Sequence, residues 1–195
     1  MKKLCIAVYL VTIVLFSATG ETDMESYFLL DDFSADRSAI GTEWKGFTDQ
    51  VMGGVSDMII TRIPEADRTF VRMQGEVSLE NNGGFIQIRL MLKSFLKPFN
   101  GSEYKGIRVK VRGKGSGYYI FLRTCSMILP WKYLAASVSV TDEWQEVDIP
   151  WSAFKQGDYG RVGKLRTNRL KSLALVAYGE EFEAMIDLAE IGLYR

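Results

Sequence analysis

The chain has 195 residues, of which 47% are hydrophobic and 25% charged, with 24 basic and 24 acidic side chains and no histidine. The charge balance argues against nucleic acid or an anionic membrane as the main partner, because either would favour a basic surface. The lack of histidine excludes Ser-His-Asp and Cys-His catalysis and the usual histidine-based metal sites. We therefore expect a non-catalytic protein with no metal and no cofactor.

The first 20 residues are typical of a secretory signal peptide. Lys2 and Lys3 precede an apolar run from Leu4 to Phe16, and small residues follow up to Gly20. The run is shorter than the roughly 20 residues that cross a bilayer, so we expect cleavage after Gly20 and no stable membrane span afterwards. The expectation is an exported bacterial protein, periplasmic or secreted, in which residues 21–26 form a short leader.

Alternation of apolar and polar residues dominates the rest of the chain. It is clearest at 107–112, and at 84–90 it leads us to expect Phe85 inside, together with Ile86 or Ile88. We expect single helical turns near 34–40 and 152–156. Many short strands bounded by Gly, Asn and Pro predict an all-β fold, an antiparallel β-sandwich of jelly-roll type, as one domain over 27–195. The expected strands are 27–33, 55–63, 69–80, 84–90, 107–112, 117–124, 132–140, 144–149, 170–177 and 182–188.

Two glycine-rich segments, 44–56 and 75–89, interrupt this alternation. Paired glycines permit positive φ and close backbone approach, and Asp, Ser and Asn side chains bond to nearby backbone groups. Either the segments are turns fixed by their own side chains and packed against each other, or they form a polar binding surface. On the second interpretation the candidate binding residues are Asp49, Gly53, Gly54, Ser56, Asn81 and Asn82.

Aromatic and arginine residues supply a further group of candidates. Exposed Trp and Tyr rings can stack on sugars, although large aromatics are equally ordinary core residues. Trp44 and Trp144 are expected in the core, whereas Trp131 follows a proline and is as well suited to a surface contact as to the core. Arginines at strand ends or on polar faces could line a concave groove. The candidate binding residues of this group are Arg89, Arg123, Trp131 and Tyr133.

Three weaker motifs allow other interpretations. Asp31 and Asp32 could join a structural calcium site, although adjacent acids are common on surfaces. Asp49 and Glu80 are the least unsuitable pair for carboxylate catalysis, but nothing in the sequence places them together. The glycines between 113 and 117 are followed by a strand instead of a helix, so we expect a hairpin connection and not a dinucleotide loop.

The glycine-rich segments also resemble those of a known family. The resemblance rests on Asp49-x-x-Met52-Gly53-Gly54-x-Ser56 and on Gly75-x-Val77-Ser78-Leu79-x-Asn81-Asn82-Gly83-Gly84-Phe85 with Arg89, and it extends over 28–194. The chain is similar in these motifs to the complex I intermediate-associated protein 30 family. That resemblance implies a galactose-binding-like β-sandwich and, from its mitochondrial members, an assembly chaperone instead of an enzyme.

The expected function is therefore a non-catalytic binding module with a protein partner, in an assembly or chaperone-like role. The alternative is a carbohydrate-binding module that binds a glycan on an aromatic-lined concave face.

Overall fold

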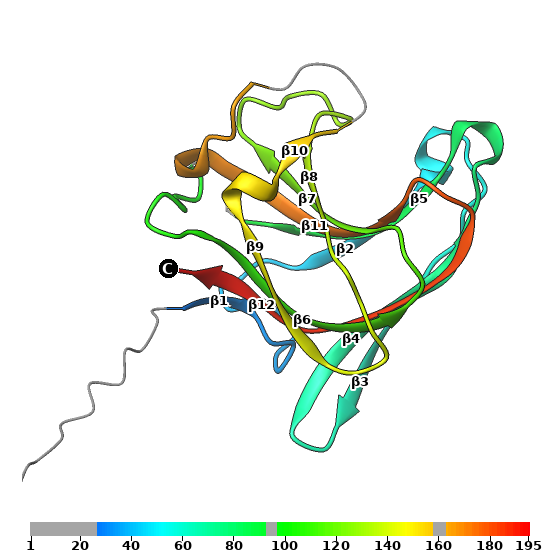
Figure 1. The fold of residues 1–195 in the computed structure, drawn as a ribbon, viewed down its shortest axis with the longest axis horizontal. Coiled ribbons are helices and arrows are strands. Elements are labelled where there is room, and N and C mark those ends of the chain that lie inside the picture. The colour runs from blue at the N-terminus through cyan, green and yellow to red at the C-terminus, as the bar shows by residue number, and fades with distance from the viewer. Residues whose placement is uncertain (1–26, 93–96, 158–162) are drawn as a thin grey trace, which may run out of the picture.

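A computed structural model describes residues 27–92, 97–157 and 163–195. The expected signal peptide and leader lie outside the described residues. Within them, two antiparallel sheets form stacked layers, as Figure 1 shows. The fold is a β-sandwich of jelly-roll type, as the sequence predicts. No helix in the described ranges is both long and apolar enough to cross a membrane.

Sheet A has six strands and sheet B has six. In spatial order, sheet A contains β3 (Ile59–Glu65), β4 (Arg68–Val77), β12 (Phe182–Tyr194), β6 (Gly106–Lys114) and β9 (Gln145–Pro150), while β1 (Phe28–Asp31) also pairs with β12. Sheet B contains β10 (Lys155–Gln156), β8 (Leu134–Ser137), β7 (Tyr118–Thr124), β11 (Leu170–Tyr178), β5 (Phe85–Met91) and β2 (Trp44–Thr48). The short 3-10 turns are η1 (Asp49–Met52), η2 (Glu80–Asn82), η3 (Trp151–Ala153) and η4 (Thr167–Arg169).

The main core fills the space between the sheets. In β6, Ile107, Val109 and Val111 point into it and are fully buried, which confirms the alternation seen in the sequence. In β5 the inward residues include Ile86 and Ile88. Each sheet therefore presents one face to the shared core and the other face outward.

Phe85 corrects our expectation for β5. It lies on the outer face of sheet B, packed against a second, smaller apolar cluster, while Ile86 occupies the core. Successive side chains of a strand point to opposite faces, so Phe85 and Ile86 cannot both point inward. The outer face of sheet B is thus partly apolar, and this fact is the basis of the candidate site.

Several element boundaries also differ from those expected. The strands β2 and β10 were not predicted, and β12 runs through to Tyr194. Bends and a turn, but no helix, occupy 34–40, whereas η3 lies at the start of the other expected helical turn. The glycines of 113–117 do not form a hairpin, because β6 belongs to sheet A and β7 to sheet B. The chain crosses between the sheets there, and Gly115 and Gly117 have positive φ at the crossing.

A candidate binding groove on sheet B

The strand register arranges the outer face of sheet B in rows that run across the strands. Directly paired residues of antiparallel strands point to the same face, so each row can be read from the register. Ala174 lies between Arg89 and Phe121, and this small side chain leaves a hollow in the middle of the face. One row is Lys45, Arg89, Ala174, Phe121 and Ala135, and the next is Phe47, Gln87, Val176, Tyr119 and Ser137.

This hollow is a cavity of about 650 Å³, and its lining is mostly apolar. The ring of Phe121 forms part of its floor and stacks on Tyr133, with 3.9 Å between ring centroids and 13° between planes. Tyr178 meets Phe121 edge to face at 5.6 Å. A floor of interlocked rings is rigid, so it presents a preformed surface to a ligand.

The glycine-rich segments form one wall of the groove, at the edge of sheet B where β5 begins. There η1 and η2 lie together, drawn in cyan and green at the right of Figure 1. The completely buried side chain of Asp49 connects the two segments through hydrogen bonds. Its Oδ2 accepts the backbone N–H of Gly84 at 2.6 Å and the hydroxyl of Ser56 at 2.5 Å, and its Oδ1 accepts the N–H of Ser56 at 3.0 Å. Ser56 is buried as well, so both side chains hold the wall and neither reaches the groove surface.

The glycines of the motifs are required by this packing. A Cβ on Gly54 would lie 2.3 Å from Cγ of Asp49, and one on Gly83 would lie 2.5 Å from its Oδ2. Gly53 ends η1 with a φ of 96°, and Asn81 and Asn82 also have positive φ, which Asn tolerates better than most residues. The motif is therefore a set of mutually fixed turns. Of its candidate residues, Asn82 lies at the groove lining.

The 125–133 loop forms the opposite wall, beyond the other end of β7. Arg123 is buried and donates hydrogen bonds to three carbonyls of this loop, those of Met127, Leu129 and Lys132. One guanidinium thus fixes the loop against the sheet. Because the two walls stand at opposite ends of the strands, the groove runs across the strands, from β2 towards β8.

Trp131 is on this second wall and differs from the other three tryptophans. The indole N–H of Trp44 donates to Asp31, that of Trp144 to Glu65 and that of Trp151 to the carbonyl of Tyr104. Trp131 lines the cavity with 52% of its surface exposed, and no hydrogen bond joins its indole to another described residue. Both its ring face and its N–H are available to a ligand.

Arg89 also faces the groove, from the middle of β5. Its guanidinium lies 4.8 Å from the ring centre of Phe47 and donates one hydrogen bond, at 3.2 Å, to Oε1 of Gln87. Burial lowers the pKa of Arg89, and both burial and the nearby charge of Arg89 lower the pKa of Arg123. Among the described residues, the groove lining contains two arginines and no acidic residue.

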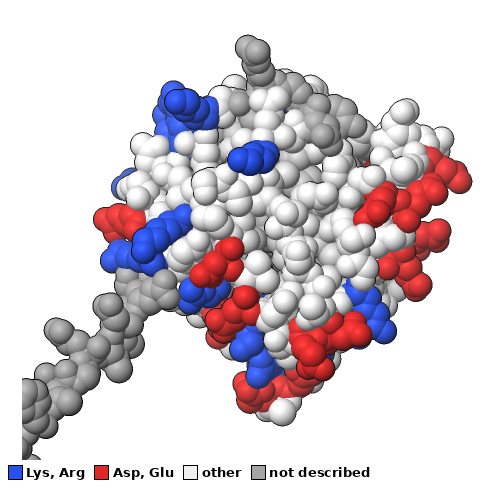
Figure 2. Space-filling model, in the orientation of Figure 1, with Lys and Arg blue, Asp and Glu red and all other residues white. Residues whose placement is uncertain are grey.

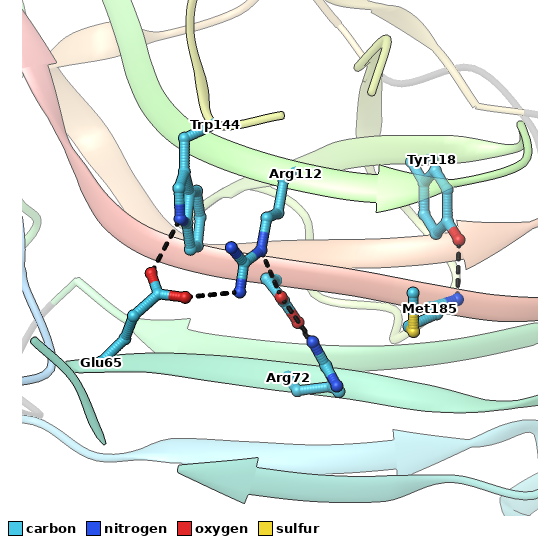
Figure 3. Close-up of polar contacts among 7 residues, drawn as sticks. Glu65, Arg72, Arg112, Tyr118, Trp144 and Met185 are labelled. Carbon is cyan, nitrogen blue, oxygen red and sulfur yellow. Dashed lines mark hydrogen bonds and ion pairs between the residues drawn. The ribbon is translucent and has the colours of Figure 1, made fainter. Parts of the chain in front are cut away.

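The outer face of sheet A is organised differently. Figure 3 shows Arg112 between the Trp144 ring and a pair of ionic contacts, one to Glu65 at 3.0 Å and one to Asp187 at 2.9 Å. Asp187 also pairs with Arg72 at 2.7 Å. Contrary to our expectation, Trp144 is half-buried on this outer face and not in the core. These charges satisfy one another. Further along sheet A a hollow of about 1000 Å³ has a mostly acidic rim, which includes Glu76, Glu181 and Glu183, and its described lining lacks the aromatic floor of the groove on sheet B.

Acidic residues gather elsewhere. Figure 2 shows Asp and Glu side chains along the right and lower parts of the molecule, while the upper part of this view is mostly uncharged. Among the residues that the structure describes, no group of three or more acidic or cysteine side chains is placed to hold a metal. Asp31 instead accepts hydrogen bonds from the Phe33 N–H and the Trp44 indole, and Asp32 from Ser34.

The fold places the protein in the class of jelly-roll β-sandwiches, and several solved structures share it. A family 11 carbohydrate-binding module of the cellulase Lic26A-Cel5E of Clostridium thermocellum superposes with a TM-score of 0.68 at 11% identity, covering 87% of this chain and 94% of that one. A family 11 module from the same organism, in complex with a β-1,3-1,4-mixed-linked tetrasaccharide, gives 0.65 at 13% identity, covering 86% and 95%. A family 30 module gives 0.54 at 13% identity, covering 77% and 91%.

The model of the complex I intermediate-associated protein 30 family matches residues 32–186, and the chain belongs to this family. Comparison with curated protein sequences gave no match. The structural likeness, at such low identity, establishes the fold, while the family match agrees with the glycine-rich motifs that the sequence displays.

Proposed function

We propose that the protein is an exported, non-catalytic binding module whose groove on sheet B holds a short stretch of a polysaccharide chain. The observation that carries the proposal is Trp131, a half-exposed ring beside an aromatic floor with no hydrogen bond from its indole to another described residue. Sugar rings present apolar C–H faces and polar edges, which such a site can match. The first 20 residues are typical of a signal peptide and so support export. An exported protein would meet the polysaccharides that lie outside the cytoplasm.

The shape of the groove supports the same proposal. Four strands, from β2 to β7, contribute residues to its floor, and at about 4.8 Å between strands they span about 14 Å, with Tyr133 extending the floor beyond β7. That length suits an oligosaccharide that lies across the strands between the two walls. One module of similar fold is in complex with a β-1,3-1,4-mixed-linked tetrasaccharide, which supports a ligand of this kind.

Calorimetric titration with a β-1,3-1,4-linked glucose tetrasaccharide tests the proposal. We expect measurable binding that Trp131→Ala weakens by at least about tenfold, because truncation of a hot-spot aromatic costs about 2 kcal/mol or more. Trp144→Ala is the matched control, since that ring lies on sheet A, and circular dichroism checks that both variants are folded. Binding that is equal in wild type and Trp131→Ala would refute the site.

Binding of a protein partner is the second candidate function. It is favoured by exposed apolar side chains on the two loops that form the walls of the groove. Val51 is 73% exposed, Met52 57% and Ile128 82%, and exposed apolar side chains of this kind can contribute to protein interfaces. An assembly or chaperone-like role in the manner of family members would use these residues. Crosslinking in the native cell envelope, with Met52→Glu and Ile128→Glu as variants, tests it, and crosslinks that both variants leave unchanged would refute it.

A further inference from the structure

No acidic side chain among the described residues balances the charge in the groove. The described lining contains Arg89 and Arg123 and no Asp or Glu, although the whole chain has as many acidic as basic residues. Lys45 pairs directly with Arg89 across β2 and β5, so its exposed side chain stands on the same face. Arg89 and Lys45 therefore place positive charge at the β2–β5 end of the groove. Towards β7 lie the rings of Phe121 and Trp131, and the Arg123 guanidinium there is bonded to loop carbonyls.

Arg89 and Arg123 differ in how much of their hydrogen-bonding capacity is used. Arg123 is committed to three loop carbonyls. Arg89 donates a hydrogen bond to the neutral amide oxygen of Gln87, and no described carboxylate forms an ion pair with it. A guanidinium has five N–H donors, so Arg89 retains several for a ligand.

Phe47 and Gln87 keep the Arg89 guanidinium in place. The Phe47 ring lies 4.8 Å from its central carbon, and Gln87 accepts one of its protons. A partly buried cation in this position costs desolvation energy that an anionic ligand would offset. The planar fork of a guanidinium matches a carboxylate, which it can bind through two parallel hydrogen bonds.

We propose that the groove selects an acidic polysaccharide, a chain of uronic acids, with one sugar carboxylate bound at Arg89 while neighbouring sugar rings lie against the aromatic part of the floor. This inference rests on the proposed function, because it names the class of glycan that the same groove binds. Lys45 adds a second positive charge on the same face, exposed on the edge strand β2 beside Arg89, where a solvated carboxylate can approach.

A matched pair of ligands tests the inference. The β-1,4-linked tetrasaccharide of glucuronate and the β-1,4-linked tetrasaccharide of glucose share a backbone and differ only at C6, where one has a carboxylate and the other a hydroxymethyl group. We expect the full-length wild-type protein to bind the acidic member at least about tenfold more tightly in calorimetric titration at low salt. We expect Arg89→Gln to reduce this ratio to nearly one, and Arg62→Gln, on sheet A, to leave the ratio unchanged.

The outcomes separate this inference from the proposed function. If the wild type binds both sugars with equal affinity, or if Arg89→Gln keeps the wild-type preference, the carboxylate site is refuted while glycan binding stands. If neither sugar binds, nor any neutral glucan tetrasaccharide, both proposals fail together.

Two further measurements do not depend on the folding of the Arg89 variant. Raising the salt from about 50 to about 500 mM should lower the preference of the wild type for the acidic sugar, because salt screens partly exposed charges. Lys45→Gln, at an exposed position, should lower the preference by a smaller factor than Arg89→Gln. A preference that neither salt nor Lys45→Gln alters would overturn the charge-based selection.

Discussion

The Oδ2 atom of Asp49 accepts the backbone N–H of Gly84 at 2.6 Å and so joins two loops that lie 35 positions apart in the sequence. The same carboxylate binds Ser56 through both of its oxygens. This contact explains why the two glycine-rich motifs occur together in one chain. They are two halves of a single wall, and Asp49 lies at their junction.

We predict that Asp49→Ala lowers the free energy of unfolding by about 2–4 kcal/mol, because it leaves several buried N–H groups without an acceptor. Urea denaturation measures the change. Ser56→Ala, which removes only the hydroxyl from the same cluster, should cost about 1 kcal/mol. Equal stability of Asp49→Ala and wild type would show that the carboxylate does not hold the wall.

Gly83→Ala tests the same junction from the other loop. The added methyl group would lie 2.5 Å from Oδ2 of Asp49, so we expect a loss of about 1–3 kcal/mol from overpacking. Gly163→Ala is the control, since nothing lies within 4 Å of the corresponding position there. Thermal unfolding of both variants gives the comparison, and an unchanged midpoint for Gly83→Ala would contradict the close approach.

Arg123 should control the order of the opposite wall. Arg123→Met keeps much of the side chain's bulk but cannot bond to the carbonyls of Met127, Leu129 and Lys132. We expect the amides of Met127 and Lys132 to exchange with deuterium at least about tenfold faster, because local opening becomes easier. The amide of Val176, at the centre of β11, is the control, and equal protection of the loop in both proteins would argue against this role.

Stability at acid pH should depend on Asp148. Hydrogen bonds from Arg108 lower the pKa of Asp148 below its ordinary value of 3.8, so the folded state binds this proton less readily than the unfolded state. The stabilisation is therefore present above the ordinary value and is lost as pH falls through the lowered one. Wild type should exceed Asp148→Asn by at most about 1 kcal/mol at neutral pH, since the pair is partly exposed. In urea titrations the difference should vanish at the lowest pH, and a constant difference would be inconsistent with the ion pair.

The layered fold could be predicted from the sequence because alternation determines which residues of a strand are buried. Val109 and Ile186 are fully buried, as their patterns predict. The edge strand β2 was missed because Gly46 and the motif after it are typical of a loop. A Cβ on Gly46 would lie 2.6 Å from side-chain atoms of Ile60 and Met58, a tertiary contact that no local pattern reveals.

The candidate site could be predicted only in part. Arg89, Arg123, Trp131 and Tyr133 were candidates, and the structure brings all four to one cavity. Phe47, Phe121 and Tyr178 were missed, because an aromatic residue in a strand suggests the core until the register assigns it to the outer face. One signal in the sequence was available. In 118–122 both the odd and the even positions are apolar or aromatic, which indicates that both faces of that strand are covered.

The indole N–H signals of the four tryptophans give the most direct test of the proposed groove. In a two-dimensional NMR titration with a glycan that the protein binds, the account predicts that the Trp131 signal shifts progressively. The signals of Trp44, Trp144 and Trp151, whose N–H groups are bonded within the protein, should stay in place. A saturable shift of Trp144 with no change at Trp131 would contradict the account, because it would place the ligand on sheet A.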